Sequence, residues 1–431
     1  MTADNTALST AAERALIEQY EAASTGDAVK LMREKAIAGF RSRGLPNRRV
    51  EEWKYTDLRR GMNEALPIAE MPAAAEAKAA VDTVAGFGDM AGARIVFVNG
   101  LYAPELSEIS GVEGLTIRSL AATLAKSRPQ GLGELAASLT DSALDLNTAF
   151  MRDGALIDVA AGAEIEKPVE ILHVAAGEPA ATYTRHVVRV GEGAKVCFSE
   201  VYSGKGHYQT NTAIEFSAAK GAEVSWIKLQ NESREAQHLS TLLSRLDGEV
   251  GFDHFIFNSG AHLSRTQTFL RFDGEGSRAE LRSAMLITEE QHCDVTLVVD
   301  HAVPNCESRE FCKSVIDGAA KGVFQGRINV FPHAQKTDGR MVSQALFLSE
   351  SVEMAYKPEL EIFADDVQCA HGATSGQIDE DLLFYLRARG IPEAEARTLL
   401  VLAFLSEVIE EIGDEQVVET LEERTRTWLG Y

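Results

Sequence analysis

The chain has 431 residues, of which 45% are hydrophobic and 25% are charged. This is the composition of a globular protein, and it excludes a largely disordered or collagen-like chain. With 42 Lys and Arg against 65 Asp and Glu, the net charge is −23. Such a charge repels phosphate backbones and anionic lipid, so we expect neither nucleic-acid binding nor attachment to a membrane.

The first 90 residues predict an N-terminal helical region. Residues 11–40 are rich in alanine and charged residues with apolar positions at helical spacing, and they predict one helix that Gly44-Leu-Pro46 breaks. Residues 67–82 predict a linker or a loose helix. Residues 1–15 contain no basic segment followed by an apolar run, so we expect no signal peptide and a cytoplasmic location.

Residues 91–152 predict a mixed α/β connecting region. Residues 94–98 read Arg-Ile-Val-Phe-Val, which is typical of a strand. Asn99-Gly100 follows directly and is a turn dipeptide, so we expect the strand to end there.

Residues 153–376 contain an internal repeat, with short β-like runs separated by glycine. One local pattern recurs at Gly162, Gly193, Gly221, Gly248 and Gly276, with a near-constant step of about 28 residues. Such a step indicates stacked units, each of which buries its apolar face only against its neighbours. We therefore predict a β-solenoid core, and spacing alone leaves an antiparallel β-sandwich open as the alternative.

Residues 377–431 predict a C-terminal helical region. Three leucines lie on one side of a predicted helix over residues 379–389, which Gly390 ends. A second helix is predicted over residues 393–412, and its apolar run at residues 399–405 is far shorter than the roughly 20 residues of a membrane span. We expect this helical pair to close one end of the solenoid, because open sheet edges recruit other chains.

Most motifs that suggest a ligand have a simpler structural explanation. No phosphate-binding P-loop is present, so we expect no ATP hydrolysis by this chain alone. Gly274-Glu-Gly276-Ser-Arg-Ala279 formally fits a dinucleotide fingerprint but lies inside the β repeat. His301, Cys306 and Cys312 match no common zinc spacing, and burial in strands explains these cysteines better.

Cys369 and His371 are the strongest candidate ligands. In an extended strand, residues two apart point to the same face, so a thiolate and an imidazole can bind one soft metal centre there. Two ligands do not close a coordination sphere, which points to a subunit boundary. A cysteine packed in the last turn and a histidine at a turn are an equally good explanation from the chemistry alone.

Two long motifs resemble a known family. Residues 360–390 contain Cys369-Ala-His371-Gly-Ala-Thr within a segment similar to the C-terminal signature of SufD, an iron–sulfur cluster assembly subunit. Gly44-Leu-Pro-Asn-Arg-Arg-Val-Glu-Glu-Trp-Lys-Tyr-Thr-Asp57 resembles the N-terminal SufD motif. The related SufB typically has an acidic residue after the histidine, where this chain has Gly372.

This resemblance implies a mainly β fold, with a right-handed parallel β-helix (solenoid) core flanked by N- and C-terminal α-helical regions. It implies a non-catalytic scaffold that pairs with SufB and binds the SufC ATPase through its C-terminal helices. His371 would be the cluster ligand at the SufB–SufD interface, with Cys369 a neighbouring one. The transient iron–sulfur cluster would be shared with SufB, reduced flavin is associated with such complexes, and the isolated chain would hold no cofactor and could form a homodimer.

Two other functions remain alternatives. A β-helix can carry a carbohydrate-active enzyme, although we find no cluster of acidic and basic residues along a groove. The chain could also be an autonomous metal-binding protein, which bound stoichiometric zinc would support.

Overall fold

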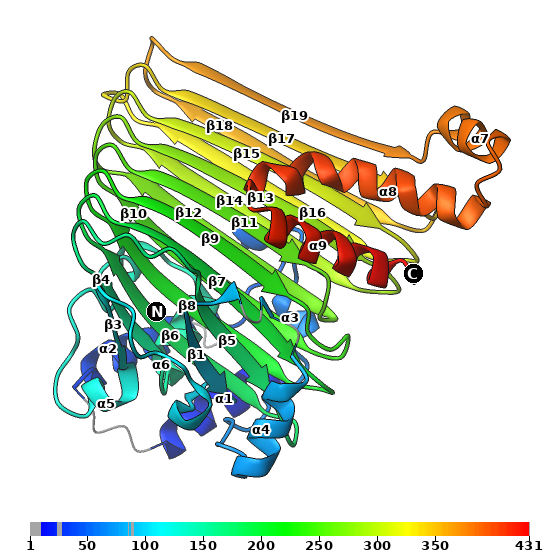
Figure 1. The fold of residues 1–431 in the computed structure, drawn as a ribbon. Coiled ribbons are helices and arrows are strands. Elements are labelled where there is room, and N and C mark those ends of the chain that lie inside the picture. Colours follow the sequence, from blue (N-terminus) through cyan, green and yellow to red (C-terminus); the bar gives the residue numbers. More distant parts are fainter. Residues whose placement is uncertain (1–9, 24–27, 85, 88–89, 431) are drawn as a thin grey trace, which may run out of the picture.

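The computed structural model describes residues 10–23, 28–84, 86–87 and 90–430, and two stacked sheets dominate it (Figure 1). The ten-stranded sheet contains, in spatial order, β19 (Gln368–Gln377), β17 (Asp338–Phe347), β15 (Glu307–Ile316), β13 (Arg278–Ile287), β11 (Gly251–Asn258), β9 (Glu223–Gln230), β7 (Lys195–Gly204), β5 (Val169–Ala175), β1 (Ala93–Val98) and β2 (Leu101–Tyr102). The nine-stranded sheet contains β18 (Glu353–Ile362), β16 (Lys321–Val330), β14 (His292–His301), β12 (Leu263–Phe272), β10 (Gln237–Leu246), β8 (Gln209–Ala218), β6 (Ala181–Val190), β4 (Ala155–Val159) and β3 (Leu115–Ser119).

Successive strands alternate between the two sheets, so each turn of the chain adds one strand to each. From β4 onward, neighbouring strands pair in parallel: Gln209 lies beside Gln237, and Gln237 lies beside Leu263 one turn later. The predicted parallel solenoid is therefore confirmed, and the antiparallel sandwich is excluded. Four of the five repeat glycines have positive φ in their turns, whereas at the fourth position Glu249 takes that conformation instead of Gly248.

The hydrophobic core lies between the two sheets. Side chains alternate along each strand, and the inward set of both sheets forms one cluster that includes Phe198, Trp226, Phe252 and Phe272. These large side chains are at most 1% exposed. Burying a side chain of this size stabilises the fold by roughly 1.5–3 kcal/mol, so the stacked turns hold one another in place.

Most of the N-terminal region covers the outer face of the nine-stranded sheet, whereas one of its helices, Ala74–Asp82, packs on β5 of the ten-stranded sheet. Its helices are α1 (Ala11–Ala22), α2 (Lys30–Arg43), α3 (Leu58–Gly61), α4 (Ala74–Asp82), α5 (Leu120–Leu124) and α6 (Ser142–Phe150). α6 packs on β6 and β8, and α2 packs on α6. The prediction of one helix over residues 11–40 is wrong, because α1 ends at Ala22 and α2 begins at Lys30. Residues 1–9, where we expect no signal peptide, lie outside the described residues.

The C-terminal helices are α7 (Glu380–Ala388), α8 (Glu393–Ile409) and α9 (Glu415–Trp428). α8 packs across the outer face of β13 and β15, and Lys313 Nζ lies 2.5 Å from Glu407 Oε2. The expectation that these helices close one end of the solenoid is therefore wrong: they cover a face, and the end stays open (Figure 1). No helix within the described residues is both long and apolar enough to cross a membrane.

Candidate functional site

The last turn of the solenoid is its open end. β18 and β19 are the outermost strands of their sheets, and among the described residues no further strand pairs with either. Nine of the ten residues of β19 are exposed, and the tenth, Cys369, is half-buried. A row of unpaired backbone groups is a template for pairing with another chain.

Cys369 and His371 lie on this last strand. They pair in register with Gly339 and Met341 of β17, and Met341 is completely buried in the core between the sheets. Because residues opposite one another in a parallel pair share a face, Cys369 and His371 both face the interior where it opens. The imidazole is exposed, and the thiol packs against the edge of the core.

The two candidate ligands differ in how easily they can bind a metal. Partial burial raises the pKa of the Cys369 thiol, so a metal must displace its proton to bind the sulfur. His371 carries an exposed imidazole, which can bind without disturbing the core. The described residues contain no group of three His, Cys, Asp or Glu able to hold a metal, so this pair lacks further ligands of those types within the described chain.

The other sequence candidates are structural. Cys306 and Cys312 are at most 2% exposed, as predicted, and His301 Nε2 lies 2.9 Å from the Ser308 hydroxyl. The glycine motif of residues 274–279 leads from β12 into β13 through a turn, with no helix to receive a phosphate. Cys306, Cys312 and His301 are therefore buried structural residues, and the glycine motif forms a turn between two strands.

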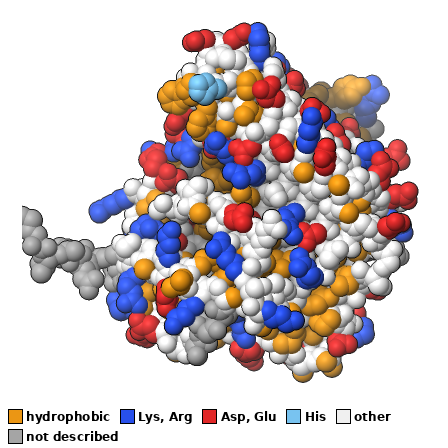
Figure 2. Space-filling model, turned by 90° about the vertical axis from the view of Figure 1, so that its left-hand side faces the viewer, with side chains coloured by type: hydrophobic (Ala, Val, Ile, Leu, Met, Phe, Trp, Pro, Cys, Tyr) orange, Lys and Arg blue, Asp and Glu red, His pale blue; other side chains and the backbone are white. Residues whose placement is uncertain are grey.

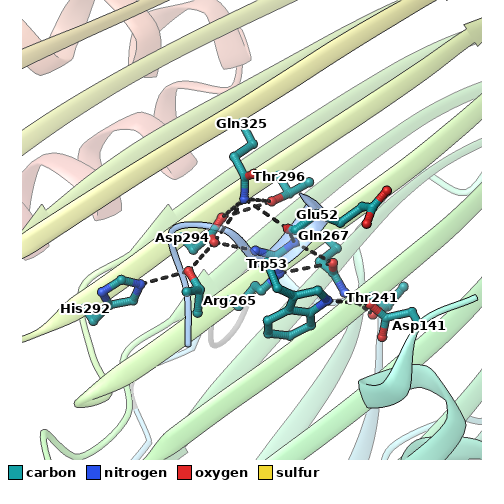
Figure 3. Close-up of polar contacts among 11 residues, drawn as sticks. Glu52, Trp53, Asp141, Thr241, Arg265, Gln267, His292, Asp294, Thr296 and Gln325 are labelled. Carbon is teal, nitrogen blue, oxygen red and sulfur yellow. Dashed lines mark hydrogen bonds and ion pairs between the residues drawn. The ribbon is translucent and has the colours of Figure 1, made fainter. Parts of the chain in front are cut away.

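The N-terminal motif docks on the outer face of the nine-stranded sheet through a buried polar cluster (Figure 3). Trp53 is 1% exposed, its indole Nε1 donates to Asp141 Oδ2 at 2.9 Å, and the Arg265 guanidinium stacks on its ring at 4.0 Å. Arg265 is ion-paired with Asp294, both side chains being 0% exposed, and donates to the Glu52 carbonyl at 2.6 Å. The motif that carries the family resemblance is therefore a clamp that holds the N-terminal region on the solenoid.

The solenoid interior also contains charged pairs that the sequence analysis missed. The ammonium of Lys228 lies 3.6 Å from Glu200 and donates to the Ser240 hydroxyl at 2.7 Å. Glu232 lies 2.7 Å from His238, and all four charged or titratable side chains of these pairs are at most 3% exposed. Alternation along the strands predicts that Glu200, Lys228 and His238 point inward, but the partner of Lys228 lies on the neighbouring turn, and Glu232 lies in the loop between β9 and β10.

The third feature is an exposed apolar surface on α7. Leu382, Phe384 and Tyr385 are 52%, 72% and 55% exposed, whereas Leu383 faces the rest of the C-terminal region and is 2% exposed. Figure 1 shows α7 projecting beyond the end of β19, away from both sheets. Arg387 pairs with Glu393 at 3.2 Å, and Arg389 stacks on Tyr385, so both arginines have partners within this region.

Comparisons with known proteins agree with this architecture. A family model described as "SUF system FeS cluster assembly, SufBD core domain" matches residues 173–404, and one described as "SufBD protein N-terminal region" matches residues 11–171. The iron–sulfur cluster assembly protein SufD of Escherichia coli is 32% identical over 86% of each chain. A SufBD family protein of Synechocystis is 29% identical over 93% of this chain and 91% of its own, and SufB of Bacillus subtilis is 25% identical over 64% and 60%. The chain therefore belongs to the SufBD family of iron–sulfur cluster assembly proteins, as a SufD-like member.

Proposed function

We propose that this chain is a non-catalytic scaffold subunit that pairs with SufB across its open last turn. In this proposal His371 and Cys369 supply part of the ligand set of a transient iron–sulfur cluster, and SufB supplies the rest. The observation that carries it is the exposed His371 imidazole beside the half-buried Cys369 thiol on β19, the edge strand of its sheet. Ligands divided between two subunits hold a cluster while the interface is closed and release it when the subunits move apart.

His371→Ala is expected to reduce cluster formation at least tenfold in a complex co-expressed anaerobically with SufB and SufC, because it removes the ligand that needs no rearrangement of the core. Folding and heterodimer assembly should be unchanged, since His371 is exposed. Visible absorption and iron content of the purified complex measure the effect, and size analysis checks assembly.

His333→Ala is the matched control, because His333 is also exposed but lies outside β19. Normal cluster content in the His371→Ala complex, at a level equal to that of the control, would remove the ligand role from His371.

We also propose that the ATPase SufC binds the C-terminal helices through the exposed apolar surface of α7. Leu382, Phe384 and Tyr385 contribute little to this chain's own core, and a surface of this kind marks a protein interaction site. Deleting everything after Asp379 is a poor test, because it also removes the buried face of α8, including Val401 and Leu405.

Phe384→Ser is expected to lower SufC co-purification at least tenfold while leaving thermal stability within a few degrees of the parent. The reason is that a ring 72% exposed in the free subunit leaves no cavity when it is removed. Phe363→Ser, at a residue 65% exposed that directly follows β18, is the control. Undiminished SufC binding by a Leu382→Ser/Phe384→Ser double variant would place the dock elsewhere.

The described residues give the alternatives no specific support. An autonomous metal centre needs three or four ligands from one chain, and no such group occurs among the described residues.

A further inference from the structure

A cavity of about 280 Å³ lies on the outer face of the nine-stranded sheet, and the residues that line it include none from β18 or β19. Its floor is one row of register neighbours across four strands: Leu243, Phe269, Val298 and Arg327. Leu135 and Leu139, in the segment just before α6, line it as well. Its volume is close to the lower end of the range of small-molecule sites, about 300–1,000 Å³.

The row of floor residues makes one end of the cavity apolar and the other end charged. Neighbouring strands lie about 4.8 Å apart, so the three steps from Leu243 to Arg327 span roughly 14 Å. The first three positions are apolar and the last is a guanidinium. A ligand that follows this floor therefore has an apolar body at one end of the row and an anionic group at the other.

The three arginines that line the cavity differ in whether they have an ion-pair partner. Arg271 and Arg245 both bind Asp273, at 2.8 and 2.5 Å, and Arg271 also lies 3.6 Å from Asp300. Arg327 has no ion-pair partner among the described residues, and its buried Nε–H has no hydrogen-bond acceptor there. Glu359, the register neighbour of Arg327 on β18, forms an ion pair with Lys357 at 3.2 Å instead.

An N–H that is buried without an acceptor is costly, and a guanidinium has the geometry to bind a carboxylate or phosphate through two parallel hydrogen bonds. Figure 2 shows Lys and Arg side chains interspersed with Asp and Glu across one face of the chain, whose net charge is −23. Asp300 and Glu134 also line the cavity and repel a second negative charge. The single unmatched cation therefore favours a monoanion over a dianion.

We propose that this cavity binds a small aliphatic or aromatic carboxylate, with the carboxylate on Arg327 and the apolar body over Phe269 and Leu243. The site is separate from Cys369 and His371, and it does not depend on the proposed partners. A bound carboxylate would bridge the strands of the solenoid and the segment that precedes α6.

Octanoate is the probe, titrated into the full-length chain by calorimetry. We expect saturable 1:1 binding, at least tenfold weaker binding of octanol, which has the same body without the charge, and weaker binding of octyl phosphate than of octanoate. Arg327→Met should weaken octanoate binding at least tenfold. Arg340→Met is the matched control, because Arg340 is exposed, paired with Asp338 and outside the cavity, and it should bind octanoate normally.

The comparison of octanoate with octanol needs no variant, so it decides the matter even if Arg327→Met does not fold. Equal affinity for octanoate and octanol, or non-saturable binding, would overturn the proposal. Unchanged octanoate binding by folded Arg327→Met would overturn it too, and tighter binding of octyl phosphate would overturn the assignment to a monoanion.

Discussion

Asp294→Ala is expected to lower the free energy of unfolding by about 3–5 kcal/mol, because it leaves the Arg265 guanidinium buried without its counter-charge. Arg265 and Asp294 are both 0% exposed, and Asp294 also accepts hydrogen bonds from Thr56 and from Gln325 Nε2, the latter at 3.3 Å. The same change therefore loosens the contact between the N-terminal motif and two strands of the solenoid. Urea unfolding followed by circular dichroism measures the loss.

Glu223→Ala is the matched control. It removes one partner of the Arg278–Glu223 pair, whose side chains are 56% and 43% exposed, and such surface pairs contribute at most about 1 kcal/mol. If Asp294→Ala cost no more than Glu223→Ala, the cluster around Trp53 would not be the clamp that holds the N-terminal region.

The solenoid was predictable because its turn chemistry repeats. In four of the five repeat turns a glycine takes the positive φ that other residues avoid, and the spacing of these glycines gives the length of one turn directly. Asn99 and Gly100 are a second example: both have positive φ, 52° and 73°, and they join the antiparallel hairpin of β1 and β2. These signals are local, so a single chain contains all the information they need.

The position of the C-terminal helices was not predictable in the same way. The apolar stripe of α8 indicates that a face is buried but does not identify the surface that receives it. That surface includes Val315 of β15 and Leu346 of β17, outward-facing residues that join α8 in one cluster. Because α8 packs on this outer face, it does not cover the last turn, and Cys369 and His371 stay accessible.

The polar contacts inside the fold were the hardest to anticipate. Trp53 and Arg265 meet from distant parts of the sequence, and the Glu200–Lys228 pair joins two successive turns. Alternation along a strand predicts which residues point inward, but the pairing of inward charges depends on the exact register. Cys369 and His371 were found because they lie two residues apart on one strand, which is a relation the sequence contains.

Glu310 provides a prediction with a distinctive pH dependence. Its side chain is buried at 1% exposure between the sheets, and neither carboxyl oxygen has a hydrogen-bond partner among the described residues. It lies in the same register row as Met341 and His371, two strands in from the open end. Burial raises the pKa of Glu310 well above its usual value, so the folded protein holds this acid neutral.

The sign of the effect follows from linkage. Below the pKa of the unfolded chain, near 4.5, the acid is protonated in both states and burial of its charge costs nothing. As the pH rises above that value, the unfolded chain ionises and the folded chain does not, so stability falls by up to about 1.4 kcal/mol per pH unit until the raised pKa is reached. The stability present in acid is therefore lost toward neutral and alkaline pH.

Glu310→Gln should remove this loss, because an amide does not titrate. As the pH rises from 5.5 to 7.5, the variant should therefore become progressively more stable relative to the parent, whatever fixed cost the amide itself brings. Urea unfolding across this pH range measures the difference in slope. Glu307→Gln, at an exposed position on the same strand, should follow the parent. Parallel pH profiles for the parent and Glu310→Gln would mean that the Glu310 carboxyl is ionised in the folded chain, which would require a partner inside the solenoid that compensates its charge.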